Sequence, residues 1–305
     1  MHDKRTVSLA TVIFVAGFAV RALQGSGLLL SKAFLAATFY FTASSVYASA
    51  QVTAASINLC ADQYLLLLAE DKQILSLSNL SHREAGSYFF EQARQYPVNK
   101  GDAEKILTLN PDVVIVGQYS SVHTVNLLQE VGLRVETLPI ANNLDTLFSN
   151  IQRVAGWIGH KQAGDKIVTE LQNRIAALEV AALPRPVAAV YDPNGYTSGA
   201  NSLRGEMMEL AGWENAASSA GIESYGKLTL EEIIHLAPDA LIESPYSPGT
   251  YSRAQITSQH PALLGAGLNP HIINIPSRMT VCAGPWTVDV IERLQAERLK
   301  LSAGL

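Results

Sequence analysis

Three aromatic side chains and one arginine stand in segments that follow short apolar runs of the sequence. They are Tyr119, Tyr196, Arg278 and Trp286. If the apolar runs are parallel strands, these segments are the loops where ligands bind in α/β proteins. Tyrosine and tryptophan combine a broad apolar surface with a polar tip, and arginine pairs with anions. We therefore predict contacts from these residues to a bulky ligand, although loop packing would explain the aromatic residues equally well and a surface ion pair would explain Arg278.

The sequence lacks several signatures of catalytic and metal sites. No Gly-x-Ser-x-Gly elbow, P-loop or His-Glu-x-x-His motif occurs, and the histidines after residue 50 include no pair at i,i+4 spacing. The common hydrolases and zinc enzymes are therefore not indicated. We expect no enzymatic activity, no metal site and no resident cofactor. A nucleophile pair of Cys60 and His123 is the enzymatic alternative that the residue types leave open.

Composition narrows the class of protein further. Of the 305 residues, 48% are hydrophobic and 16% are charged, which is typical of a chain that folds around an apolar core. The net charge is -5, and no run of Lys and Arg follows the first 50 residues. A nucleic-acid partner is not expected, because binding to phosphates needs clustered positive charge.

Short β-branched runs alternate with longer helical patterns, which is typical of parallel α/β architecture. The predicted strands are Ala55–Leu59, Ile74–Leu77, Val113–Val116, Val135–Leu138, Val187–Tyr191, Ala240–Ile242 and Ile272–Ile275. The predicted helices are 61–69, 102–109, 121–131, 143–158, 161–182, 201–211, 229–236, 253–264 and 285–300. In the first of these helices, Asp62 has the position and chemistry of an N-terminal cap.

One predicted helix is long enough to join two halves of the chain. Apolar residues recur at helical spacing from His160 to Ala182, and Pro184 and Pro186 then end the pattern. We predict an N-terminal α/β lobe over residues 51–159, a linking backbone helix over 160–183 and a C-terminal α/β lobe over 184–305.

The N-terminus has the layout of a secretory signal. Lys32 precedes the apolar run 33–43, and Ala48-Ser49-Ala50 has the small residues of a cleavage site. Residues 1–50 are therefore predicted as a signal peptide, with a mature chain in the periplasm that starts at Gln51. A second apolar run at 6–20 leaves open a start codon further downstream, or a hairpin retained in the membrane.

The two cysteines, Cys60 and Cys282, fall in the first and last of the predicted ligand-binding loops. Two cysteines in an exported chain commonly form a disulfide. Such a bond would join the two lobes if the Cα atoms lie within about 7 Å of each other. The alternative is two thiols that face the ligand and could meet a soft metal. Both residues are predicted site residues, and the sequence does not decide between the two states.

Two segments of the chain echo each other. Residues 104–116 are EKILTLNPDVVIV and residues 231–242 are EEIIHLAPDALI, so Glu104 and Glu231 each stand seven residues before a proline. The repetition predicts equivalent places in two similar lobes. Each glutamate is also explained as a solvated carboxylate at the start of a helix.

Taken together, these features resemble a known family. The segments ASINLCADQYLLLLA and YTSGANSLRGEMMELAGWEN, the paired Glu…Leu-x-Pro-Asp strands and the linking helix are similar to the periplasmic substrate-binding proteins of ABC importers for vitamin B12, haem and ferric siderophores. The likeness covers roughly residues 54–300. It implies two Rossmann-like lobes joined by one long backbone helix, with a ligand cleft between the lobes and little lobe movement.

The resemblance also implies partners. Glu104 and Glu231 match the surface glutamates with which the family docks onto arginines of the membrane permease, and Glu232 would take over if the alignment shifts by one. The expected ligand is an iron chelate, a ferric siderophore or haem, with cobalamin as the alternative. A ligand-binding sensor or scaffold subunit is a further alternative. We expect a monomer.

Overall fold

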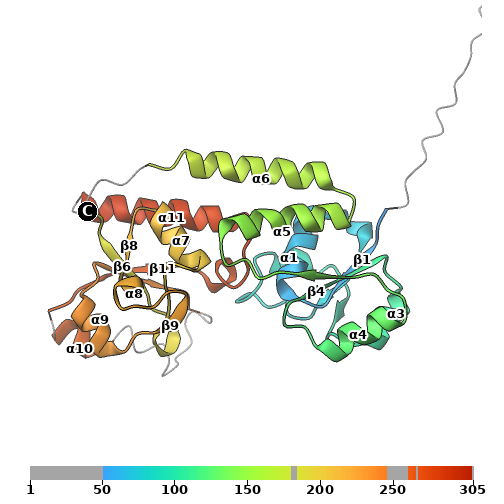
Figure 1. Ribbon diagram of the computed structural model, residues 1–305, viewed down its shortest axis with the longest axis horizontal. Coiled ribbons are helices and arrows are strands. Elements are labelled where there is room, and N and C mark those ends of the chain that lie inside the picture. Colours follow the sequence, from blue (N-terminus) through green and yellow to red (C-terminus); the bar gives the residue numbers. More distant parts are fainter. Residues whose placement is uncertain (1–50, 180–183, 246–259, 266, 304–305) are drawn as a thin grey trace, which may run out of the picture. The chain divides into compact units, whose positions relative to one another are not determined.

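The computed structural model describes residues 51–179, 184–245, 260–265 and 267–303, shown in Figure 1. The predicted signal peptide, and most of the helix predicted at 253–264, lie outside these residues. Within the described part of the chain, no helix combines the length and the apolar character needed to cross a membrane.

The N-terminal lobe is a five-stranded parallel sheet with the order β3-β2-β1-β4-β5. Its strands are β1 (Ala54–Ser56), β2 (Ile74–Ser78), β3 (Val98–Asn99), β4 (Val113–Gly117) and β5 (Val135–Leu138). Its helices are α1 (Leu59–Leu68), α2 (Phe90–Ala93), α3 (Ala103–Leu109), α4 (Val122–Glu130) and α5 (Leu144–Trp157). The chain leaves β1 toward β2 and β3, then returns to β4 on the other side, so the topological switch point lies between β1 and β4.

The C-terminal lobe repeats this plan with a four-stranded parallel sheet of order β11-β10-β6-β8. Its strands are β6 (Val187–Val190), β8 (Glu214–Asn215), β10 (Ala240–Glu243) and β11 (His271–Asn274); β7 (Tyr196–Ser198) and β9 (Tyr225–Lys227) form a separate antiparallel pair. The helices are α7 (Leu203–Leu210), α8 (Ala216–Ser219), α9 (Leu230–Leu236), α10 (Pro261–Gly265) and α11 (Trp286–Ser302). The switch point of this sheet lies between β6 and β10.

The fold-class prediction of two Rossmann-like lobes is confirmed, and all seven predicted strands are present within a few residues of their expected ends. Strands β3, β7, β8 and β9 were not predicted, because segments of two or three residues are too short to show a period of two. The two parallel sheets fall within the predicted lobe ranges. The domain boundaries themselves stay a prediction.

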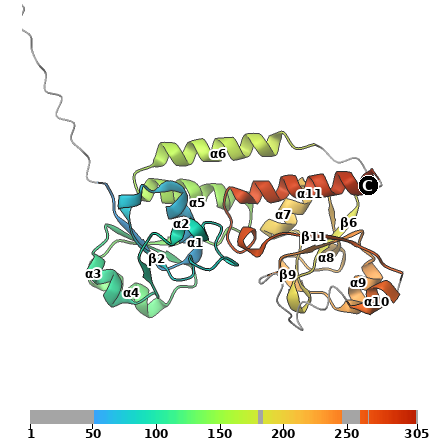
Figure 2. The ribbon, with the colours of Figure 1, turned by 180° about the vertical axis from the view of Figure 1, so that it is seen from behind.

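The linking helix is shorter than predicted. Helix α6 (Lys161–Ala176) runs alongside both α5 and α11 (Figures 1 and 2), and at 16 residues it extends about 24 Å. Its expected continuation to residue 182 is wrong for residues 177–179. There Leu178 packs against the main core, and Gln295 Nε2 of α11 donates to the Glu179 carbonyl at 3.0 Å. Tertiary contacts with α11 thus end a helix that the local sequence would allow to continue.

Ion pairs hold α6 against the C-terminal lobe. The Arg174 guanidinium contacts Asp289 at 2.7 Å and Glu292 at 2.6 Å, both on α11. Hydrogen bonds from the Arg174 guanidinium to Glu292 and Asp289 raise the pKa of that arginine. Since the three side chains are about one third exposed, solvent screens the pairs and their net contribution is modest. Gln152 Nε2 of α5 donates to Asp165 of α6 at 2.9 Å, so α6 contacts helices of both lobes.

The two echoed segments occupy equivalent places, as predicted. Helices α3 and α9 each end in a left-handed residue before the proline, Asn110 at φ 47° and Ala237 at φ 43°. The aspartate after each proline then accepts a backbone N–H from the neighbouring strand region: Thr53 donates to Asp112 at 2.7 Å, and Val187 donates to Asp239 at 2.8 Å. The Thr53 backbone and hydroxyl groups lower the pKa of Asp112. The Pro-Asp pair therefore aligns β4 with β1 in one lobe and β10 with β6 in the other.

Candidate ligand-binding site

At the switch point of the N-terminal lobe, Asn58 connects β1 to α1. Its side-chain oxygen accepts the backbone N–H groups of Cys60 at 3.0 Å and Ala61 at 3.1 Å, so Asn58 caps the helix. The Asn58 side chain also fills the space where a Cβ atom on Gly117 would lie. A glycine at the end of β4 thus allows the two neighbouring loops to approach each other.

Asp62 does not cap α1, contrary to the prediction. It is fully buried, and its carboxylate accepts the Ser78 backbone N–H at 3.0 Å together with the Ser78 hydroxyl. Burial raises the pKa of Asp62 to about 7, although the Ser78 donors oppose the shift. Asn58 caps the helix instead, because it directly precedes the helix in extended backbone, where a side-chain oxygen reaches the first N–H groups.

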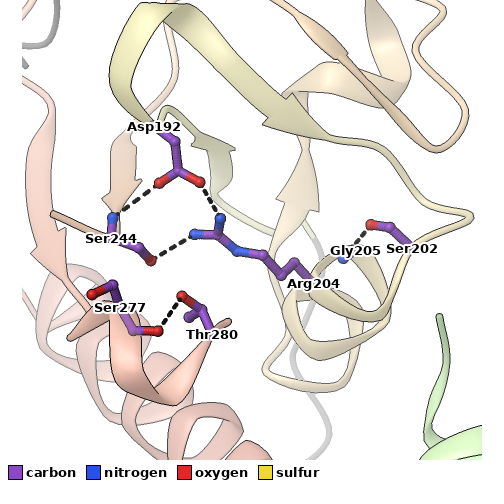
Figure 3. A network of polar contacts seen from close by, with 7 residues as sticks. All are labelled: Asp192, Ser202, Arg204, Gly205, Ser244, Ser277 and Thr280. Atoms are coloured by element: carbon purple, nitrogen blue, oxygen red, sulfur yellow. Dashed lines mark hydrogen bonds and ion pairs between the residues drawn. The ribbon is translucent and has the colours of Figure 1, made fainter. Parts of the chain in front are cut away.

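The switch point of the C-terminal lobe is occupied by a polar network, drawn in Figure 3. Arg204 of α7 pairs with Asp192 after β6 and donates to the Ser244 hydroxyl after β10 at 3.0 Å. The second Asp192 oxygen accepts the Ser244 backbone N–H at 3.0 Å. The network thus joins both strands of the switch point to α7. Arg204 was not among the predicted site residues, since nothing in the spacing of SLRG indicates a partner twelve residues earlier.

The glycines of the motif YTSGANSLRG explain how α7 reaches this place. A Cβ atom on Gly199 would collide with the Ile222 and Glu223 carbonyls, and one on Gly205 would collide with the Gly199 backbone. Between them Ser202 caps α7, accepting the Gly205 N–H at 3.1 Å (Figure 3). Close backbone packing at two positions therefore sets the start of the helix that carries Arg204.

Three tyrosines in or beside these loops expose their rings. Tyr119 follows β4 and is 85% exposed, and Tyr196 and Tyr225 stand on β7 and β9 at 53% and 62%. The Lys227 ammonium lies 4.6 Å from the centre of the Tyr196 ring. Tyr225 was not predicted as a site residue, because the strand that carries it, β9, was not predicted. Exposed Leu80, Ile140 and Val281 stand in the loops after β2, β5 and β11.

The two cysteines form a disulfide. Their Cα atoms lie 5.2 Å apart and the sequence separation is 222 residues. The alternative of two free thiols that face a ligand or a soft metal is therefore wrong. A nucleophile pair of Cys60 and His123 is wrong for the same reason, because the Cys60 sulfur is bonded to the Cys282 sulfur. Among the described residues, no cluster of three or more His, Cys, Asp or Glu has the arrangement of a metal site.

Trp286 is 1% exposed, so its predicted role as a ligand contact is corrected to packing. Its ring stacks on Tyr88 of the N-terminal lobe with centres 4.4 Å apart. Arg278 is partly exposed and faces Glu84 at 3.5 Å, so it forms the surface ion pair that was predicted as the alternative to a ligand contact. Its charge is therefore offset by a carboxylate and does not by itself favour an anionic ligand.

Glu104 and Glu231 both lie in the first turn of an exposed helix, α3 and α9. Neighbouring Glu232 accepts the Thr229 backbone N–H at 2.7 Å, and this bond and the Thr229 hydroxyl lower its pKa. Glu232 is thus engaged in a capping box, whereas Glu231 precedes it on the open first turn. The equivalent places of α3 and α9 in the two lobes put Glu104 and Glu231 at matching positions.

A serine and a lysine with the Ser-x-x-Lys spacing of some serine hydrolases also occur, at Ser224 and Lys227. Side chains three residues apart share a face on a helix but point to opposite faces on an extended chain. Lys227 belongs to β9 and its ammonium lies over Tyr196. The spacing therefore carries no catalytic pair here.

Loops from the carboxyl ends of both sheets contact each other. Besides the disulfide and the Arg278–Glu84 pair, the Tyr225 hydroxyl donates to Asn142 after β5 at 3.4 Å. The Leu144 backbone N–H donates to Glu206 of α7 at 2.8 Å. The segments that carry Tyr119, Tyr196, Tyr225 and the Arg204 network thus belong to the ends of the two sheets that approach each other.

Comparisons with known proteins agree with this architecture. The model of the periplasmic binding protein family matches residues 55–279. A cobalamin-binding protein of Halobacterium salinarum is 25% identical over 198 residues, which cover 61% of this chain and 52% of that protein. The chain therefore matches only about half the length of this relative.

Two solved structures share the fold. The periplasmic haem-binding protein RhuT from Roseiflexus sp. RS-1, in apo form, superposes with a TM-score of 0.68 at 22% identity, covering 81% of this chain and 97% of that one. The periplasmic haem-binding protein HutB of Vibrio cholerae superposes with a TM-score of 0.67 at 20% identity, covering 81% and 99%. Because the family model matches residues 55–279, which is more than half of the chain, this chain belongs to the periplasmic binding protein family.

Proposed function

We propose that this chain is a receptor of the periplasm that binds an iron chelate, a ferric siderophore or haem, and delivers it to the permease of an ABC importer. The observation that carries the proposal is the approach of the carboxyl-end loops of two parallel sheets, with exposed Tyr119, Tyr196 and Tyr225 in or beside these loops. Ligands of open α/β sheets bind at such switch points, and aromatic rings give broad contact to bulky chelates.

A cobalamin ligand is the second candidate. Two arginines in or beside these loops face carboxylates, Arg278 with Glu84 and Arg204 with Asp192, so the positive charge that these two offer to an anionic chelate is offset. The Halobacterium salinarum relative is named as a cobalamin-binding protein.

Ligand titration of residues 51–305 tests the proposal. We expect one of haem, cobalamin and ferric hydroxamate, catecholate or citrate chelates to quench tryptophan fluorescence saturably, with a free-tryptophan control for ligand absorbance. Alanine at Tyr119, Tyr196 or Tyr225 should weaken binding of that ligand about three- to tenfold each, since an aromatic contact contributes about 0.5–1.5 kcal/mol.

The control for this titration is Leu299→Ala, which removes a 39% exposed side chain from α11. Its affinity should equal that of the unaltered chain. Saturable binding that none of the three tyrosine variants weakens would contradict the proposed site. No binding to any of these chelates would contradict the proposed ligand classes.

The proposed permease contact is tested by charge reversal at Glu104 and Glu231. Uptake by cells carrying Glu104→Lys/Glu231→Lys should fall about tenfold or more, because carboxylate–guanidinium pairs at an interface contribute several kcal/mol. Ligand affinity should not change, because neither glutamate belongs to the candidate ligand site, and α3 follows edge strand β3 instead of a strand at the switch point. Glu130→Lys, at the exposed end of α4, is the matched control. Unchanged uptake in the double variant would refute the docking role and favour a sensor or scaffold subunit.

A further inference from the structure

Apart from the connection through α6, loops of the two lobes contact each other at two sets of described residues that differ in strength. The first set, here called the cystine side, joins Cys60 and the segment 84–88 to the segment 277–286. It contains the disulfide, the Trp286–Tyr88 stack and a hydrogen bond from the Ser277 hydroxyl to the Ala85 carbonyl at 2.5 Å. Cys282, Trp286 and Ser277 are 3%, 1% and 6% exposed, so this side is covalent and these three contact residues are buried.

The turn that carries this side is itself rigid. The Trp286 indole Nε1 donates to the Cys282 carbonyl at 2.8 Å, so the ring folds back over its own loop. A Cβ atom on Gly284 would collide with that ring, so the glycine allows the ring to pack closely against the turn. One compact turn therefore presents both the sulfur and the indole to the N-terminal lobe, and the two cannot move separately.

The second set, here called the Glu206 side, is joined by hydrogen bonds and carries no covalent bond between the lobes. Glu206 accepts the Leu144 N–H at 2.8 Å, and Tyr225 donates to Asn142 at the long distance of 3.4 Å. Asn142 and Tyr225 are exposed. Each bond exchanges a protein partner for water when it opens, so each contributes only about 0.5–1.5 kcal/mol, or somewhat more where the acceptor is charged.

In each sheet, the strand order puts the residues of the cystine side and those of the Glu206 side on opposite flanks of the switch point. In the N-terminal sheet the cystine side follows β1 and β2, and the Glu206 side follows edge strand β5. In the C-terminal lobe the cystine side follows edge strand β11, and the Glu206 side comes from α7 and β9, which are connected to β6 and β8. The candidate ligand position therefore lies between a covalent contact and a hydrogen-bonded one.

We propose that the cystine side is a permanent hinge and that the lobes separate at the Glu206 side alone. If the chain has the proposed function, on which this step rests, separation at the Glu206 side is the route by which the ligand enters and leaves. The device needs no change in the disulfide, which stays oxidised throughout.

Hydrogen exchange on residues 51–305 without ligand tests the hinge. The amide of Leu144 and the peptide over 222–227 should exchange about tenfold or more faster than the peptides over 84–88 and 277–286, since a tenfold difference corresponds to about 1.4 kcal/mol of local opening free energy. Glu206→Ala should accelerate exchange at Leu144 and leave the cystine side unchanged. Glu209→Ala, an exposed glutamate one turn further along α7, is the matched control and should change neither.

Equal protection on both sides, or faster exchange on the cystine side, would overturn the hinge. These measurements use no ligand, so their failure does not bear on the proposed function. With a ligand identified, Glu206→Ala should raise its dissociation rate about three- to tenfold, as expected for the loss of a hydrogen bond to a charged group. An unchanged dissociation rate alongside faster Leu144 exchange would refute the route while leaving the hinge in place.

Discussion

Replacement of both Cys60 and Cys282 by serine is expected to lower the free energy of unfolding by about 5 kcal/mol. The bond spans a sequence separation of 222 residues, and the loss of chain entropy for a loop of that length amounts to about 5 kcal/mol at 25 °C. Urea unfolding of residues 51–305, followed by tryptophan fluorescence, measures the change. This is large for a single cross-link because nearly the whole described chain lies inside the closed loop.

The unaltered chain under a reductant provides the control. Reduction should shift its unfolding midpoint as far as the double serine variant is shifted, and it should leave the variant itself unaffected. Equal midpoints for the oxidised chain and the variant would show that the bond contributes nothing. A shift in the variant without one in the reduced chain would assign the effect to the serines instead of the cross-link.

The second large effect is a dependence of stability on pH that comes from Asp62. Burial raises its pKa to about 7 from 3.8, so the folded chain binds more protons than the unfolded chain between these values. Stability from this group is fully present below pH 3.8 and is lost as pH rises through 7. A shift of about three pKa units corresponds to a loss of about 4 kcal/mol by pH 8.

Asp62→Asn isolates this contribution, because asparagine resembles the protonated carboxyl and can still accept the Ser78 N–H. We expect the variant and the unaltered chain to be about equally stable at pH 4, with the variant more stable by as much as about 4 kcal/mol at pH 8. Unfolding titrations at intervals of one pH unit measure the difference. Asp145→Asn, at an exposed position on α5, should show no such divergence. A constant difference between Asp62→Asn and the unaltered chain would contradict the assignment.

Much of the architecture could be predicted from local patterns. The parallel strands are buried on both faces, as in Val113–Gly117, so they appear in the sequence as short continuous apolar runs. The two Leu-x-Pro-Asp segments revealed the internal repeat, because each lobe needs the same helix end and the same aspartate to align its neighbouring strand. The candidate loops followed from the strands, because ligand loops come after the carboxyl ends.

The errors arose where a contact across the fold decided the outcome. Trp286 is of a residue type that often contacts bulky ligands, yet Tyr88 covers its ring. The Arg204 network was missed because its partners, Asp192 and Ser244, belong to two strands that are adjacent only in the folded sheet. Helix α6 ends early because α11 binds the chain that follows it.

The class of fold and the internal repeat could thus be inferred from the sequence, because they depend on periodicity and on the chemistry of adjacent residues. The family was suggested only by the resemblance of whole segments, such as YTSGANSLRGEMMELAGWEN, to known members. Only the tertiary structure decided the state of Cys60 and Cys282, the burial of Trp286 and the pairing of Arg278 with Glu84. Each of these depends on how the loop after β11 meets the other lobe. Local propensity carries no information about such long-range contacts, since their free energy is gained only when two lobes distant in sequence pack together.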